Sequence, residues 1–103
     1  KQVVSGVIKK AINFKMADEK ISDGDILVVN ALTDDYLNII HKTAGVIVET
    51  NQVTPEISVE AMKHDIPVIA EALEAMSVLT EGTLVTIDGK RSLVINGRTV
   101  LKS

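Results

Sequence analysis

The sequence predicts an α/β fold with mixed parallel and antiparallel strands and a β-meander at its C-terminal end. Its apolar residues are mostly β-branched, with 26 Val and Ile against 8 Leu in 103 residues, and such a composition favours sheet. Two apolar runs, 26–29 and 46–48, lie on either side of a helical pattern, which indicates a βαβ unit. Asp-Gly and Asn-Gly pairs separate three β-branched runs near the C-terminus, and these pairs are strong hairpin signals.

The first quarter of the chain is predicted to be mostly extended. Val and Ile are interleaved with Ser and Lys from residue 2 to residue 14, and Gly6 among them indicates a β-bulge. A polar stretch over 16–22 and a Ser-Asp-Gly-Asp turn over 22–25 follow. They lead into the apolar run 26–29, which is typical of a strand covered on both faces.

A helix is predicted between the two apolar runs. Thr33 is placed to cap it, and Asp34 and Asp35 put negative charge at the positive end of the helix dipole. Gly45 ends the helix just before the apolar strand 46–48. The two strands are therefore expected to be parallel, with a right-handed connection.

A second helix is predicted from Thr54 to about His64. Thr54 is a favoured N-cap residue, Pro55 suits the first helical position, and Glu56 carries negative charge in the first turn. The helix ends near His64, because the proline that opens a short strand over 67–69 disfavours helical backbone before it.

The remaining elements complete one compact unit. An alanine- and glutamate-rich stretch over 70–76 predicts a short helix, and the meander is expected from strands 84–87, 92–95 and 99–101. The chain has no linker, repeat or low-complexity tract, so residues 1–103 are expected to form a single domain.

Composition excludes several classes of function. The absence of cysteine excludes disulfides, thiolate zinc sites and a cysteine nucleophile, and it fits a reducing, cytoplasmic setting. A formal net charge of -3 argues against a nucleic acid partner, and no apolar stretch is long enough to predict a membrane span. Because the chain begins with Lys1 and not with Met, we expect it to be cut from a longer protein.

The titratable residues give structural interpretations first. His41 and His64 fall at predicted helix ends, where a basic group interacts well with the dipole, and neither has a His, Asp or Glu three or four residues later to build a metal site. Turns and caps account for the densest group of acidic residues, which are Asp23, Asp25, Asp34 and Asp35. The polar stretch 50–52 lies between a strand and a helix, where open α/β sheets bind ligands, but this spacing alone is a weak signal.

A family resemblance adds more than spacing does. The residues that carry it are Gly24-Asp25-Ile26-Leu27-Val28, Thr33-Asp34, Ala44-Gly45-Val46-Ile47-Val48, Thr54, Ile66-Pro67-Val68-Ile69 and Gly82-Thr83-Leu84-Val85-Thr86-Ile87-Asp88-Gly89. In this order and spacing, roughly over residues 20–95, the chain resembles the mobile phosphohistidine domain of phosphoenolpyruvate-utilising enzymes. The resemblance implies a swivelling β/β/α domain.

The resemblance also implies a phosphohistidine site in which this sequence departs from the family. The family has a Gly-Gly-x-Thr-Ser-His stretch whose His begins a helix and carries the phosphoryl group near free amides. The corresponding residues here, 51–56, keep only Thr54, and Glu56 stands where the His would be. The degenerate site then consists of Asn51, Gln52, Thr54 and Glu56. Two glycines that the family usually has, after the strand ending at 69 and at position 92, are also replaced.

The leading hypothesis follows from this loss. The domain is expected to be the accessory C-terminal domain of a bacterial pyruvate kinase, whose phosphoryl transfer from phosphoenolpyruvate to ADP takes place in a separate barrel. The domain itself is then structural or regulatory, with no catalytic residue, metal or cofactor of its own. The resemblance implies Mg²⁺ and K⁺ for the parent enzyme, whose remaining chain and other subunits would be the partners in a homo-oligomer.

Two alternatives remain open. One is an independent module that binds a small ligand or a protein at the helix start over residues 51–56. The other is a residual phosphocarrier that uses His64 or His41, although His64 stands about 12 Å along the predicted helix from the phosphate end.

Overall fold

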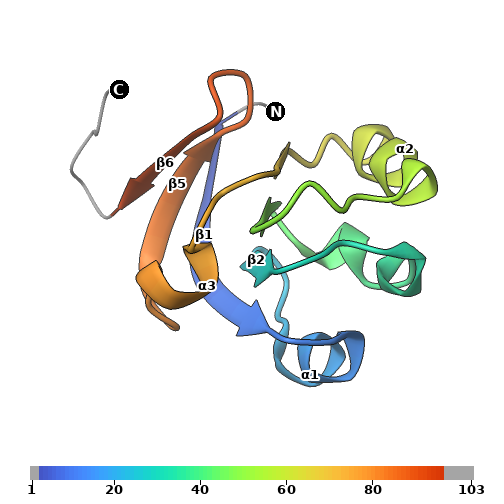
Figure 1. Cartoon of the computed structure of the whole chain (residues 1–103), viewed down its shortest axis with the longest axis horizontal. Helices are drawn as coiled ribbons and strands as arrows, with labels where there is room; N and C mark the ends of the chain where they lie inside the picture. The colour runs from blue at the N-terminus through green and yellow to red at the C-terminus, as the bar shows by residue number, and fades with distance from the viewer. Residues whose placement is uncertain (1–2, 97–103) are drawn as a thin grey trace.

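The computed structural model describes residues 3–96, which form a six-stranded sheet with helices packed against it (Figure 1). The strands are β1 (Val3–Ala11), β2 (Ile26–Val29), β3 (Gly45–Val48), β4 (Val68–Ile69), β5 (Leu84–Asp88) and β6 (Leu93–Asn96). The helices are α1 (Phe14–Lys20), α2 (Pro55–Lys63) and α3 (Ala75–Val78), with two 3₁₀ turns, η1 (Asp34–Tyr36) and η2 (Ile40–Lys42). The strand order is β4-β3-β2-β1-β5-β6.

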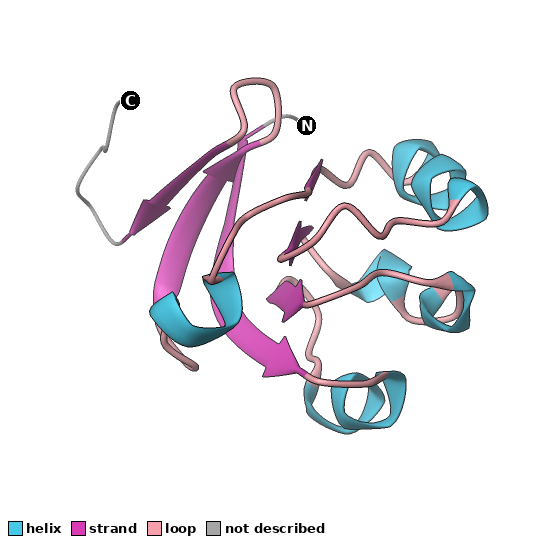
Figure 2. Cartoon of the chain, viewed as in Figure 1, coloured by secondary structure: helices cyan, strands magenta, loops and turns pink. Residues whose placement is uncertain are grey.

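Strand β1 joins two halves of this sheet. Its residues from Ile8 to Ala11 pair in parallel with β2, and those from Val3 to Val7 pair antiparallel with β5. The sheet bends along β1, so that β5 and β6 form a layer of their own beside the parallel strands, while α1, α2 and the 3₁₀ turns cover the other side (Figure 2). The predicted β/β/α architecture with mixed strands is therefore confirmed.

The parallel strands are buried on both faces, as their apolar runs predict. All residues of β2 have no exposed surface, and Leu27 and Val29 contact the helix layer. Ile26 and Val28 point the other way, into a second core with Val85 of β5. Because a buried side chain of this kind contributes about 1.5–3 kcal/mol, these two cores account for most of the burial that holds the fold together.

Gly6 does not form the predicted β-bulge. The pairing of β1 with β5 runs without interruption from Val3 to Val7. A Cβ atom at position 6 would lie only 2.3 Å from the carbonyl oxygen of Gly24. Glycine is needed here because the turn before β2 crosses directly against β1.

Helix α1 lies where the sequence predicts only an extended segment and a polar stretch. Asn13 caps it, because its side chain accepts a hydrogen bond from the amide of Met16 at 2.9 Å. Ala17 is its one fully buried residue. A helix of seven residues that buries one small side chain carries almost no apolar periodicity, so only the cap could have indicated it.

The helix predicted after Thr33 is not an α-helix. The segment forms η1 and η2, separated by a turn, and the side chain of Thr33 makes no cap hydrogen bond. Ile39 and Ile40 still bury their side chains, so the predicted apolar stripe reaches the core through a tighter backbone. Burial, together with the neighbouring Asp35 carboxylate, raises the pKa of Tyr36 to about 12 and keeps its hydroxyl neutral.

The helix predicted over 70–76 is also wrong in its bounds. Its first part is irregular, with left-handed backbone at Glu71 and Glu74, where φ is 58° and 63°. The short helix α3 begins only at Ala75. No helix in the part of the chain that the structure describes is long and apolar enough to cross a membrane.

The hairpin at Asp88-Gly89 is confirmed by β5 and β6. Asp88 organises its turn, accepting hydrogen bonds from the amides of Lys90 and Arg91 and an ion pair from the Arg91 guanidinium at 2.8 Å. Ser92 closes the turn in the left-handed region, with φ 54°. The predicted third strand of the meander, 99–101, lies outside the described residues.

Candidate functional site

The predicted site residues lie at the carboxyl ends of the parallel strands. Residues 49–54 lead from the end of β3 to the start of α2. The chain that continues from β2 runs alongside them, with an isolated parallel bridge between Leu32 and Val53. This is the edge at which open α/β sheets bind ligands.

The loop after β3 is held by its backbone and by one hydroxyl. The side chain of Thr50 donates to the carbonyl of Asn30 at 2.6 Å and accepts from the amide of Gln52 at 3.1 Å. The amide of Leu32 donates to the carbonyl of Gln52 at 2.8 Å. The side chains of Asn51 and Gln52 are exposed, so they face solvent from a loop whose backbone is already ordered.

Thr54 occupies the predicted cap position of α2, but its hydroxyl does not cap the helix. Its backbone is extended, and Pro55 takes the first helical position, as predicted. The Thr54 hydroxyl donates instead to the carboxylate of Asp34 in η1. Thr54 therefore ties the start of α2 to a 3₁₀ turn that precedes it by 20 residues.

The start of α2 carries negative charge. Glu56 is exposed in the first turn, and the Asp34 carboxylate lies at the cap. Both charges occupy the place that the helix dipole makes favourable for an anion, and Pro55 removes one amide donor. An incoming phosphate would therefore meet two carboxylates in place of a free anion site.

A hollow of about 410 Å³ opens beside this loop, lined by Glu49, Thr50, Asn51, Glu71 and Leu73. Of the four predicted site residues, only Asn51 reaches it. Its exposed lining is more apolar than polar, and its charged lining residues, Glu49 and Glu71, are both acidic, so the hollow suits a neutral or cationic ligand more than an anion.

The structure adds two residues to the candidate site, Asp34 and Glu49. Glu49 directly follows the apolar run of β3, and this position at the end of a predicted parallel strand could have indicated it. No local signal places Asp34 beside Thr54, because that contact depends on how η1 packs against α2.

The two histidines lie together, at the end of α2 that is remote from Glu56. His41 is in η2 and His64 is the C-cap of α2, and their ring centroids are 6.3 Å apart. Nε2 of His64 lies 3.1 Å from the carboxylate of Glu60, which precedes it by one helical turn. A metal-ligand pattern that contains only residues three or four positions after each histidine does not include this partner. The described residues nevertheless contain no group of three or more side chains arranged to hold a metal ion.

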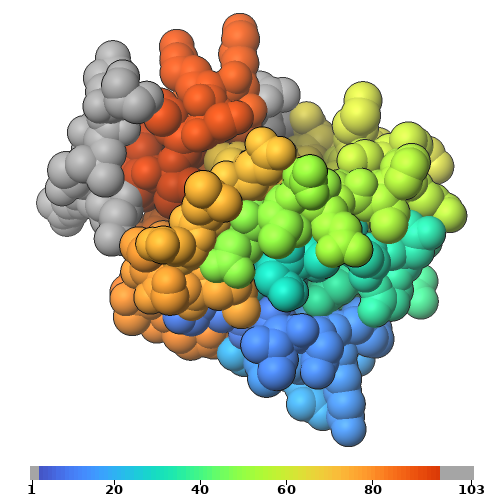
Figure 3. All heavy atoms as spheres, viewed as in Figure 1, coloured from blue at the N-terminus to red at the C-terminus, as the bar shows by residue number. Residues whose placement is uncertain are grey.

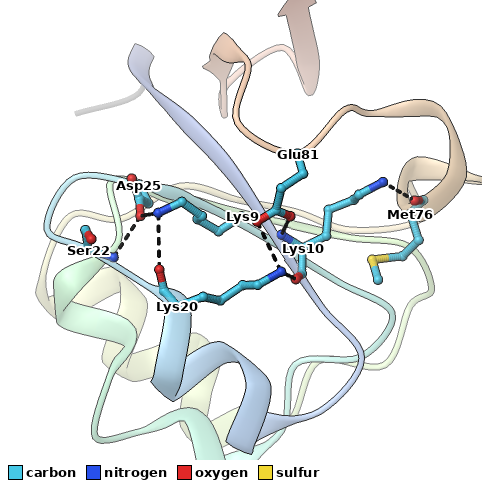
Figure 4. A network of polar contacts seen from close by, with 7 residues as sticks. All are labelled: Lys9, Lys10, Lys20, Ser22, Asp25, Met76 and Glu81. Carbon is cyan, nitrogen blue, oxygen red and sulfur yellow. Dashed lines mark hydrogen bonds and ion pairs between the residues drawn. The ribbon is translucent and has the colours of Figure 1, made fainter.

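The four acidic residues that are dense in the sequence do not form a cluster. Asp25 is buried before β2, where it accepts from the ammonium of Lys9 at 2.8 Å and from the amide of Ser22 at 2.7 Å (Figure 4). Asp34 lies beyond the other end of β2, and this strand, which spans about 13 Å, separates it from Asp25. The prediction that turn and cap duties account for these residues is confirmed for Asp25, whose carboxylate accepts from the amide of Ser22 across the turn before β2.

Lysines of β1 and α1 join the layers of the fold to each other (Figure 4). The Lys20 ammonium donates to the carbonyl of Lys10 at 2.6 Å and pairs with Glu81 at 3.1 Å. Partial burial raises the pKa of Glu81, but the amide of Lys10 and the charge of Lys20 outweigh it and hold the pKa below its usual value. The Lys10 ammonium reaches the carbonyl of Met76 in α3 at 2.9 Å.

Comparison with known families identifies the domain type. The family described as PEP-utilising enzyme, mobile domain, matches residues 21–92. The match runs from the turn before β2 to the turn between β5 and β6, and so it contains the whole candidate site.

Curated relatives include two kinds of enzyme. A pyruvate kinase of Lactobacillus delbrueckii subsp. bulgaricus is 34% identical over 88% of this chain, and one of Bacillus licheniformis is 33% identical over 90%. A phosphoenolpyruvate synthase of Aeropyrum pernix is 28% identical over 92%. The chain spans 12% to 16% of the length of these relatives.

Proposed function

The chain belongs to the mobile-domain family of PEP-utilising enzymes, and on that premise we propose that it is a non-catalytic accessory domain of a bacterial pyruvate kinase. Pyruvate kinases and phosphoenolpyruvate synthases are both among its relatives, so the choice between them depends on the site. The observation that carries the choice is Glu56, which stands in the first turn of α2 where the family resemblance implies a phosphohistidine.

The chemistry at this position supports the choice. A phosphocarrier needs an imidazole nitrogen to attack phosphorus and amide donors to hold the resulting anion. The first turn of α2 offers a carboxylate and a proline instead, with Asp34 beside them. A synthase that passes its phosphoryl group through this domain would be inactive with such a site, whereas a pyruvate kinase works in its barrel.

The proposed role is to stabilise or regulate the parent enzyme. Its partners would be the rest of that chain and the other subunits of a cytoplasmic homo-oligomer. Mg²⁺ and K⁺ would serve the barrel, and we assign neither ion to residues of this domain.

One test is to incubate the chain with phosphoenolpyruvate and an active phosphoenolpyruvate synthase and to measure its intact mass. We expect no acid-labile gain of one phosphoryl group, because α2 begins without a nucleophilic imidazole. The synthase itself, which must become labelled, is the positive control. A gain that disappears in His64→Gln or His41→Gln would contradict the proposal and identify a residual phosphocarrier.

A second candidate function is a small-ligand module, and the hollow of about 410 Å³ beside Asn51 favours it. Chemical-shift changes over residues 49–56 on addition of a small amine such as ethanolamine, without any mass gain, would support this candidate, whereas the anionic phosphoenolpyruvate should cause smaller changes because Glu49 and Glu71 line the hollow. The complete reading frame around residues 1–103 gives an independent test, because the main proposal requires a pyruvate kinase barrel in it.

A further inference from the structure

The most exposed leucine of the described chain lies next to an apolar hollow. Leu73 is 82% exposed and Val78 is 68% exposed. Both line a hollow of about 180 Å³ with Ile47, Ala72, Ala75, Leu79 and Val94. Every lining residue is apolar, so Leu73, Val78 and this hollow form a continuous surface, which we name the α3 ridge.

The backbone presents Leu73 outward by a strained conformation. The residues at 71 and 74, on either side of it, are both left-handed glutamates, a geometry that is unfavourable for any residue with a Cβ atom. Two hydrogen bonds hold the segment to the end of β3. The amide of Glu71 donates to the carbonyl of Thr50 at 2.9 Å, and the amide of Ala72 donates to the carbonyl of Val48 at 3.0 Å. The exposed position of Leu73 is thus built into the fold.

Side chains from elsewhere in the fold bind both backbone groups of Met76 in helix α3. The amide of Met76 donates to the carboxylate of Glu49 at 3.1 Å. The carbonyl of Met76 accepts from the ammonium of Lys10 at 2.9 Å (Figure 4). These contacts order the part of the ridge that carries Val78. An apolar surface that is already ordered loses little conformational entropy when a partner covers it.

The charges around the ridge select the partner. Glu71 and Glu74 are exposed beside Leu73, Glu49 lies behind them, and the ammonium of Lys10 is engaged with α3. A second copy of the chain docking symmetrically would bring these carboxylates against themselves, and like charges oppose such pairing. A partner with an apolar pocket edged by Lys or Arg is complementary.

We propose that the α3 ridge is the docking surface for an apolar, Lys- or Arg-edged surface elsewhere in the longer enzyme. The inference rests on the proposed function, in which the chain is one domain of a larger protein. The ridge also borders the candidate site, because Leu73 lines the hollow that contains Asn51, and Figure 3 shows the segment over 70–79 (amber) beside the loop after β3 (green). A partner seated on the ridge would cover the edge of that site.

Hydrogen exchange measured by mass spectrometry tests the proposal. The complete protein encoded by the reading frame is compared with the 103-residue chain. We expect amides over 70–79 to exchange about tenfold more slowly, or slower still, in the complete protein. The double variant Leu73→Ser/Val78→Ser, made in the complete protein, should abolish this protection, whereas Ile12→Ser, which alters a side chain that is 67% exposed outside the ridge, should leave it unchanged.

Charge is tested separately. Glu71→Lys/Glu74→Lys should weaken the protection, and added salt should weaken it in the unmodified protein. Equal exchange over 70–79 in the two proteins would overturn the inference, and so would concentration-dependent dimers of the isolated chain that Leu73→Ser/Val78→Ser dissolves. A reading frame that adds a domain other than a pyruvate kinase barrel would overturn the proposed function alone, and the exchange data would still decide the inference.

Discussion

The parallel strands differ in packing from the segments at their carboxyl ends, residues 49–56 and 70–79, which we call the rim. β2 and β3 are buried on both faces, and their backbone is regular throughout. The rim a few residues beyond them has two left-handed glutamates, an exposed leucine and a helix start occupied by carboxylates. The strands are constrained by packing on every side, whereas the rim is constrained only where its backbone attaches to them.

This difference shows how a domain can keep its fold while its site changes. Almost all burial lies in the two cores, which contain none of Asn51, Gln52 and Glu56. Replacing a rim residue therefore removes little buried area, and the fold persists whatever chemistry the rim carries.

The largest effect is expected from a Leu→Ala substitution made once in the buried strands and once on the rim. Leu27→Ala, in the fully buried strand β2, should lower the free energy of unfolding by about 3 kcal/mol because it leaves a cavity. Leu73→Ala, on the rim, should change it by less than about 0.5 kcal/mol. Urea denaturation of both variants measures the difference. Similar losses for the two would mean that the rim is packed as tightly as the core.

A smaller effect concerns the strained backbone of the rim. Glu71→Gly should raise the free energy of unfolding by about 0.5 kcal/mol, because relief of left-handed strain exceeds the entropy that glycine costs. The same change at Glu56, in the first turn of α2, should instead lower it by a similar amount. Thermal denaturation distinguishes the two signs, and a loss at both positions would show that the backbone at 71 is unstrained.

The smallest effect is at the ion pair between Glu81, in the loop before β5, and Lys20 of α1. The folded-state pKa of Glu81 is below its ordinary value of 4.5, so its contribution to stability is present above that pH and is lost as the pH falls through the folded-state pKa. Because the side chain is 41% exposed, Glu81→Gln should cost only a few tenths of a kcal/mol at pH 7.

Urea denaturation at pH 7 and at pH 3 measures this dependence. The difference in the free energy of unfolding between Glu81→Gln and the unmodified chain should become smaller at the lower pH. Lys20→Gln, which removes the cation of the pair, should show the same narrowing. A difference that stays constant would mean that neither the ion pair with Lys20 nor the hydrogen bond from the amide of Lys10 favours the ionised carboxylate.

The predictions that succeeded used strong local signals. The apolar runs at 26–29 and 46–48 indicated strands buried on both faces, and Thr54-Pro55-Glu56 indicated the start of a helix. Those that failed lacked such signals. Helix α1 buries a single alanine fully, and the segment 34–42 forms two short 3₁₀ turns that its apolar spacing does not distinguish from an α-helix.

The candidate site was predicted in the same uneven way. Asn51, Gln52, Thr54 and Glu56 lie at the strand ends and helix start where the sequence places them. The hollow beside Asn51 is lined largely by residues that were not predicted, and Glu71 reaches it only through a left-handed backbone. The pairing of Thr54 with Asp34 joins segments 20 residues apart, so no periodicity or turn signal contains it.

The sequence alone determined which segments are buried strands, where α2 begins, and that a glutamate stands in its first turn. These depend on side-chain pattern and turn chemistry within a few neighbouring residues. Only the tertiary structure decided that Gly6 accommodates a crossing turn, that Asp34 pairs with the N-cap residue of α2, Thr54, and that Leu73 projects from the rim. Each of these depends on contacts between residues distant in the chain, which exist only after the layers have packed.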